Sequence, residues 1–251
     1  MLEWLLSPIN PSALHQVPPW AAWHGRCMVL AWGALLPMGV LAARFYKVLP
    51  TQDWPKNLDN PAWWHAHRAS QYLGVLLMGL GLVLAWQQGQ GATALAQWHG
   101  FLGWSLFVLA ALQVLSAWLR GSKGGPLDAA LRGDHYDMSM RRVVFERWHK
   151  TLGWLALALG LLSIVLGLLL ANAPRWMALV LGAWWLLLAC AAWRLQKAGR
   201  CVDTYQAIWG PDAVHPGNAK TPIGWGVCRP GPSAPDRAIS RSSRFRNSRV
   251  I

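Results

Sequence analysis

Long apolar stretches without charged residues dominate the chain. No Lys, Arg, Asp or Glu occurs within residues 27–43, 69–119, 151–174 or 176–193. A helix needs about 20 apolar residues to cross roughly 30 Å of hydrocarbon, so each stretch is long enough to span a bilayer. The apolar residues run continuously instead of alternating, which predicts helices and excludes a β-barrel.

The stretch 69–119 is long enough for two spans, and a polar, glycine-rich segment at 87–93 predicts a turn within it. The pattern therefore predicts five helices, at 22–45, 64–86, 97–119, 147–170 and 175–195. The expected fold is an all-α membrane protein with five transmembrane helices, of which the first four form a four-helix bundle. None of these predicted spans contains an acidic residue.

The composition excludes an ordinary soluble protein, since 54% of residues are hydrophobic, 13% are charged and 19 are Trp. Of the 23 Lys and Arg, Arg26 and Arg175 fall on the N-terminal side of this topology. The positive side of a membrane protein is cytoplasmic, which places the N-terminus outside and the C-terminus in the cytoplasm, as in a bacterial inner-membrane protein. The net charge of +13 thus indicates topology, and no part of the chain outside the helices predicts nucleic-acid binding.

The sequence divides into three regions. Residues 1–20 form an extracytoplasmic segment without the basic start of a cleavable signal peptide, 21–196 the transmembrane domain, and 197–251 a basic cytoplasmic tail. The last part of the tail, about 25 residues, is rich in Ser, Arg and Pro and is expected to be disordered. The four cysteines are scattered, which predicts no structural disulfide, and the absence of a Cys-x-x-Cys-His motif excludes covalent c-type haem.

Histidines open each of the first four predicted helices and not the fifth. Because helix direction alternates, His24 and His99 share the outer level; we call them the outer pair. His149 shares the inner level with His67 or His65, and we call His67 and His149 the inner pair. Imidazoles from facing helices of a bundle are typical axial ligands of b haems. For any single histidine, a location in the headgroup region is an equally good explanation.

Two histidines compete for the inner position on the second helix. The repeated Trp-His pattern favours His65, whereas His67 lies about 3 Å deeper in the span and is preferred here. His15, His135 and His215 fall in polar loops, where solvation is expected.

Small and cationic neighbours fit the same interpretation. Gly25, Gly103 and Gly153 would leave bare helix faces for a flat macrocycle, although glycine also serves close helix packing. Each haem carries two propionates that need cationic partners at the membrane edge. The candidates are Arg26 outside and Arg68 and Lys150 inside, where the positive-inside rule explains the charges equally well.

Several segments in order resemble the cytochrome b561 family of the eukaryotic, ferric-reductase-like type. They are Trp23-His24-Gly25, Trp32-Gly33, Ala43-Arg44, His67-Arg68-Ala69-Ser70-Gln71, His99 with Gly103, Leu112-Gln113 running to Leu119-Arg120, and Trp148-His149 with Gly153. They cover residues 20–170. The chain resembles a bacterial, stand-alone member of the family.

The resemblance implies two haem b groups with bis-histidine ligation, one on His24 and His99 and the other on His67 and His149. It also implies an oxidoreductase that moves electrons from a small cytoplasmic donor such as ascorbate to an outer acceptor such as monodehydroascorbate or a ferric chelate. Arg44, Lys47 and the inner loop at 132–142 would suit an anionic donor.

Three alternatives stay open from the sequence. The chain could be a haem b membrane anchor between quinone and a partner dehydrogenase, docked through Tyr205, Trp209 and Trp225. It could be a histidine-lined transporter without haem, a reading that lacks the usual intramembrane acids. A structural membrane protein explains no histidine placement, and the fifth helix leaves homodimerisation open.

Overall fold

The computed structural model describes residues 1–13, 16–86, 88, 93–124 and 132–230. His15 and segment 231–251, for which solvation and disorder are expected, lie outside the described residues. The described chain is helical, and its β-structure consists of two isolated bridges, Pro8 with Pro174 and Val202 with Cys228.

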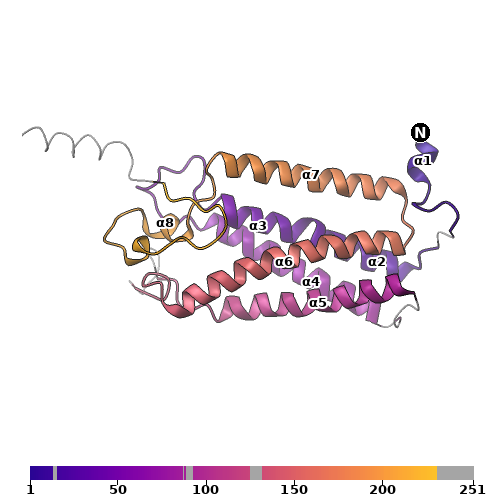
Figure 1. The fold of residues 1–251 in the computed structure, drawn as a ribbon, viewed down its shortest axis with the longest axis horizontal. Helices are drawn as coiled ribbons and strands as arrows, with labels where there is room; N and C mark the ends of the chain where they lie inside the picture. The colour runs from indigo at the N-terminus through magenta and orange to yellow at the C-terminus, as the bar shows by residue number, and fades with distance from the viewer. Residues whose placement is uncertain (14–15, 87, 89–92, 125–131, 231–251) are drawn as a thin grey trace, which may run out of the picture.

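Five helices are long and apolar enough to cross a bilayer, which confirms the predicted fold class (Figure 1). The first, Pro19–Phe45, joins α2 (Pro19–Met28), the π-helical η1 (Val29–Leu35) and α3 (Leu36–Phe45). The others are α4 (Ala62–Trp86), α5 (Ala94–Trp118), α6 (Met140–Leu170) and α7 (Arg175–Lys197). Three short helices complete the described chain: α1 (Leu2–Leu6), α8 (Thr204–Trp209) and the 3₁₀ helix η2 (Pro216–Ala219).

Helix α6 begins at Met140, about two turns before the predicted edge at 147. The Ser139 side chain caps it by accepting a hydrogen bond from the backbone N–H of Arg142. Glu146 then pairs with Arg142 at 3.0 Å and with Lys150 at 2.7 Å, each one turn away. The predicted span begins at 147 because it is defined by the absence of charged residues, and these first turns of α6 carry several. Glu146 therefore lies within the fourth spanning helix, which corrects the expectation that no span contains an acid.

The first four spanning helices form the bundle. Helix α4 packs along the first helix, α5 packs along α6, and η1 brings the first helix against α6. Trp32 lies at the centre of the core and is 4% exposed. It rests on Gly160 of α6, where an added Cβ would meet the Trp32 Cε3 atom at 2.5 Å. The other buried residues of this core are Ala31, Leu36, Met78, Leu106, Ala110, Ala156 and Ile164.

Pro37 explains how α7 is attached to the bundle. Proline has no N–H to donate to the carbonyl four residues earlier, which is that of Gly33. The indole N–H groups of Trp184 and Trp185 donate to this oxygen at 3.0 and 3.3 Å. In lipid, where water cannot satisfy a free carbonyl, these two bonds stabilise the contact between α7 and the first helix.

We expect the double substitution Trp184→Phe and Trp185→Phe to lower the free energy of unfolding by about 1–3 kcal/mol, because it leaves the Gly33 carbonyl without these donors. Thermal unfolding in detergent measures the effect. Trp193→Phe is the matched control, since this α7 indole is 63% exposed and makes no polar contact with the described residues. Equal melting temperatures for both variants would contradict this explanation.

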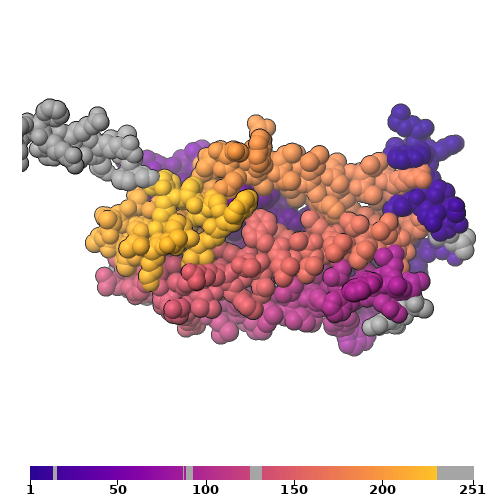
Figure 2. All heavy atoms as spheres, viewed as in Figure 1, coloured from indigo at the N-terminus to yellow at the C-terminus, as the bar shows by residue number. Residues whose placement is uncertain are grey.

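Residues 198–230 fold over one end of the bundle, and we call this segment the cap (Figures 1 and 2). Its stretch from 201 to 210 is buried throughout and includes α8. Tyr205, Ile208 and Trp209 of α8 pack with Met138 in a second apolar cluster. The described part of the basic tail is thus a folded element.

Candidate functional site

The outer pair consists of two rings from α2 and α5. His24 and His99 lie with ring centroids 6.0 Å apart and ring planes at 80°. Both side chains are half-buried. The topology predicted that these two histidines share a level, and the structure brings their rings face to edge.

The inner pair comes from α4 and α6 near the opposite end of the bundle. His67 and His149 have centroids 6.3 Å apart and planes at 80°. His65 is exposed, and none of the described ring contacts includes it. His67 therefore faces His149 and His65 does not, because residues two apart point to different sides of a helix.

Backbone carbonyls of neighbouring helices orient three of the four rings. The Nδ1 atom of His24 lies 2.8 Å from the Gly81 oxygen, that of His67 3.0 Å from Gly39, and that of His99 3.1 Å from Ser163. An Nδ1–H that donates to a carbonyl leaves Nε2 as the free lone pair, which is the usual arrangement of a metal-bound histidine. No hydrogen bond within the described chain uses Nε2 of these rings.

Two of these carbonyls belong to Gly81 and Gly39, and the sequence does not predict this role for either glycine. At Gly81, an added Cβ would meet the Met28 Cε atom at 2.9 Å, and at Gly39 it would clash with the side chains of Ser70 and Gln71. Both glycines let α4 approach the first helix closely enough for the carbonyl contacts. Their partners lie 57 and 28 residues away, which no local motif could reveal.

Each pair fits a haem iron between its rings. A metal held about 2 Å from a nitrogen of each of two opposed imidazoles places the ring centroids about 6 Å apart, which matches both pairs. Within the described residues, no three His, Cys, Asp or Glu side chains converge as they would around a bare metal ion. Two axial histidines suffice for haem, because the macrocycle supplies the remaining ligands. The fourth ring differs from the other three, because Nδ1 of His149 is buried without a hydrogen-bond partner among the described residues.

The three glycines predicted to leave bare helix faces have free space or ordinary contacts beside their Cα atoms. At Gly25 and Gly103, an added Cβ would meet nothing within 4 Å. At Gly153, the nearest atom is the Gln113 Nε2, at 3.6 Å. Gln113 also donates to the His149 carbonyl at 3.0 Å.

The predicted cations differ in their surroundings. Arg26 is exposed and stacks on Trp23, with its Cζ 4.7 Å from the ring centroid. Arg68 stacks on Trp64, the ring next to His67. Lys150 instead points to the cap: its amine donates to Glu146 and, at 2.7 Å, to the carbonyl of Ile223.

Other bases at the inner end also bind cap carbonyls. Arg44 donates to the Trp225 oxygen at 2.7 Å, and Lys47 donates to the Val202 oxygen at 3.0 Å. Burial and the nearby Lys150 lower the pKa of Lys47 to about 8. These bases, considered above for an anionic donor, hold the cap to the bundle.

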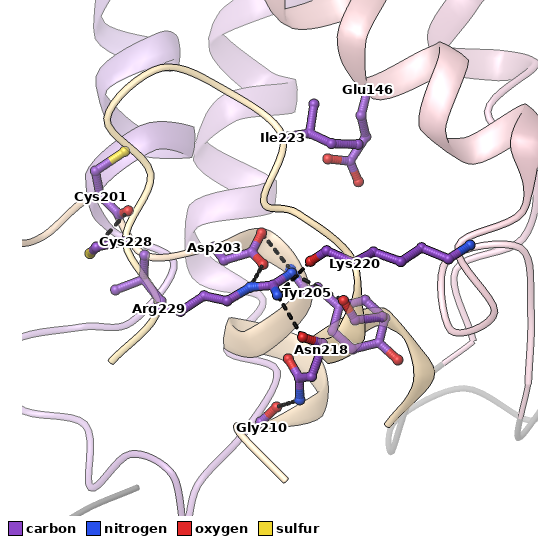
Figure 3. Close-up of polar contacts among 12 residues, drawn as sticks. Glu146, Cys201, Asp203, Tyr205, Gly210, Asn218, Lys220, Ile223, Cys228 and Arg229 are labelled. Atoms are coloured by element: carbon purple, nitrogen blue, oxygen red, sulfur yellow. Dashed lines mark hydrogen bonds and ion pairs between the residues drawn. The ribbon is translucent and has the colours of Figure 1, made fainter. Parts of the chain in front are cut away.

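Within the cap, Arg229 joins segments that are apart in the sequence (Figure 3). Its guanidinium bonds Asp203 at 2.7 Å and donates to the carbonyls of Asn218, Lys220 and Gly217. The segment from α8 to the last described residues is therefore fixed as one unit.

His135 is fully buried beneath the cap, which corrects the expectation that it is solvated. Its ring lies against Tyr205 with centroids 5.5 Å apart, and its Nε2 atom is 3.5 Å from Glu146. Burial lowers its pKa to about 3, and the nearby Arg142 acts in the same direction, so the ring is neutral. His215 is half-buried against Tyr136.

Comparison with known proteins finds matches to this arrangement. A family model described as eukaryotic cytochrome b561 matches residues 23–124, which include His24, His67 and His99. Residues 23–124 are therefore similar to a cytochrome b561 domain. The family implies haem b as the cofactor. His149 lies beyond the matched segment, so its assignment rests on the geometry of the inner pair.

The similar proteins are longer than this chain. An Arabidopsis thaliana protein named for its cytochrome b561, DM13 and DOMON domains is 31% identical over 145 residues, which are 58% of this chain and 14% of that protein. A second Arabidopsis thaliana cytochrome b561 and DOMON domain-containing protein is 30% identical over 148 residues and is covered to 27%. Human ferric-chelate reductase 1 is 29% identical over 147 residues, 58% of this chain and 22% of the reductase. No solved structure matches the chain.

Proposed function

We propose that this chain transfers electrons across the membrane through two b haems. His24 and His99 hold the outer one, and His67 and His149 hold the inner one. The observation that carries the proposal is the presence of two facing imidazole pairs at two levels of one bundle. When bound, such haems supply one-electron transfer.

The chain's own contribution is to fix the ligands and to exclude other chemistry. The carbonyls of Gly81, Gly39 and Ser163 set the ring orientation and the tautomer of three histidines. A haem held by both histidines of a pair would have no open coordination position, which would favour outer-sphere electron transfer over oxygen chemistry. The buried core around Trp32 keeps water out of the space between the two levels.

We further propose a direction from the cytoplasm outward. The bases Arg44, Lys47, Arg68 and Lys150 gather at the capped end, which the positive-inside rule makes cytoplasmic. A small anionic reductant such as ascorbate is the proposed donor at this end. A ferric chelate or monodehydroascorbate is the proposed acceptor outside, supported by the similarity to ferric-chelate reductase 1.

Vesicles test this proposal directly. Ascorbate trapped inside proteoliposomes should reduce a membrane-impermeant ferric chelate outside, at a rate well above that of protein-free vesicles. His149→Ala should return the rate to the protein-free level, whereas the exposed His65→Ala should leave it unchanged. No increase over empty vesicles with the haem-loaded protein would overturn the proposed electron transfer.

The alternatives have less support in the structure. Of the three aromatic residues considered for docking a dehydrogenase, Tyr205 and Trp209 are buried within the cap, and only Trp225 is exposed, at 78%. The transporter reading needs an intramembrane acid, and the buried Glu146 is already paired with Arg142 and Lys150.

A further inference from the structure

Two arginines share one aromatic ring at the inner end of the bundle. The Cζ atom of Arg120, which follows α5, lies 4.3 Å from the centroid of Trp64. The Cζ atom of Arg68 on α4 lies 5.6 Å from the same ring and 5.8 Å from Tyr72. Neither guanidinium makes a hydrogen bond or an ion pair with the described residues.

Three other bases near these arginines have oxygen partners. Arg141 donates to the Leu119 carbonyl at 2.7 Å, Arg142 pairs with Glu146, and Lys150 takes the other oxygen of that carboxylate. Both carboxylate oxygens of Glu146 are thus already paired with other bases. Arg68 and Arg120 have no anionic partner in the described chain, and they differ from the exposed Arg147 in sharing the Trp64 ring.

This arrangement is electrostatically costly for Arg120. Its side chain is half-buried, and burial together with Arg142 and Arg68 lowers its pKa to about 10. Like charges repel more strongly where the dielectric is low, and a cation–π contact offsets the cost only in part. A bound anion would remove the imbalance.

The place where the anion belongs lies beside the inner pair. The Trp64 ring that carries both arginines is itself next to His67, with ring centroids 6.2 Å apart. Guanidinium forks match carboxylates in shape and charge, so two of them suit a ligand with two carboxylates.

We propose that Arg68 and Arg120 together bind the two propionate carboxylates of the haem held by the inner pair. This inference rests on the proposed function and adds Arg120 to the binding residues. Lys150, the other inner cation that the sequence predicts as a propionate partner, instead holds Glu146 and the cap.

A titration of apo-protein with haem b and with haem b dimethyl ester tests the assignment, because esterification removes the carboxylate charge. The inner site is the binding phase that His67→Ala abolishes. In the wild type, the ester should bind this site at least about tenfold more weakly than haem, the expected size for lost charge-assisted hydrogen bonds. In the double variant Arg68→Gln and Arg120→Gln, haem should bind as weakly as the ester, and the two ligands should no longer differ.

Two controls separate a carboxylate contact from a general loss of charge or fold. Arg132→Gln removes an exposed arginine that stacks on Tyr136 at 5.1 Å, and Lys150→Gln removes the cation nearest in sequence to His149. Both should keep the preference of the inner site for haem over its ester. The double variant should keep the outer binding phase, which reports that the bundle is folded.

A preference for haem that survives in the double variant would overturn the inference, as would its loss in Lys150→Gln. A double variant that binds haem normally but needs far more ascorbate for reduction would assign the two arginines to the reductant instead and would also overturn it. Failure of the proposed function looks different, since the wild type would then show no second haem-binding phase at all.

Discussion

The substitution His67→Ala is expected to yield a protein with one b haem per chain instead of two. The alanine removes one ligand of the inner pair, whose rings lie 6.3 Å apart, and His149 alone cannot fill both axial positions. The outer pair draws its ligands from α2 and α5 and its carbonyl contacts from Gly81 and Ser163, so it should keep its haem. The pyridine haemochrome of purified protein measures the count.

The neighbouring His65→Ala is the matched control for this loss. It removes the same side chain two residues away, but that ring is exposed and takes part in no described ring contact. This variant should retain both haems. Loss of one haem in His65→Ala, with both retained in His67→Ala, would reverse the assignment of the inner ligand.

The second large effect is expected for Gly160→Ala on α6, which should lower the free energy of unfolding by about 1–3 kcal/mol through overpacking. The added Cβ would meet the Trp32 ring at 2.5 Å for Cε3 and 2.9 Å for Cδ2. Trp32 is only 4% exposed and is packed within the buried core cluster. The melting temperature of the haem-loaded protein should fall accordingly.

Gly182→Ala on α7 provides the control with the opposite sign. Nothing lies within 4 Å of its added Cβ, so the change should stabilise the helix by about 0.5–1 kcal/mol relative to glycine. Equal effects of the two substitutions would show that the first helix and α6 do not depend on the Trp32 contact.

Both the five spans and the pairing of levels follow from the sequence, because charge gaps and alternating direction determine them. The start of α6 does not, since Arg142, Glu146 and Lys150 satisfy one another along the helix and a charge count excludes them. The attachment of α7 also does not follow from the sequence. Pro37 leaves the Gly33 carbonyl free, but the indoles of Trp184 and Trp185 that donate to it lie 151 and 152 residues further along the chain.

The candidate site divides in the same way. The four histidines near the starts of the apolar stretches are visible in the sequence, whereas the carbonyls of Gly39, Gly81 and Ser163 are backbone groups brought from other helices. The folded cap is the largest difference from the expectations. Its basic composition predicts a tail, but the burial of α8 and the bonds of Arg229 arise from long-range contacts that composition does not encode.

The most direct test of the central claim is the number and ligation of haems in the wild-type protein. Pyridine haemochrome analysis, combined with electron paramagnetic resonance of the oxidised protein, should give two b haems per chain, both low-spin with two histidine ligands. Because the imidazole planes of each pair are 80° apart, both haems should give a low-spin signal with a large maximum g value. A single haem per chain, or a high-spin iron with an open position in the purified protein, would contradict the account.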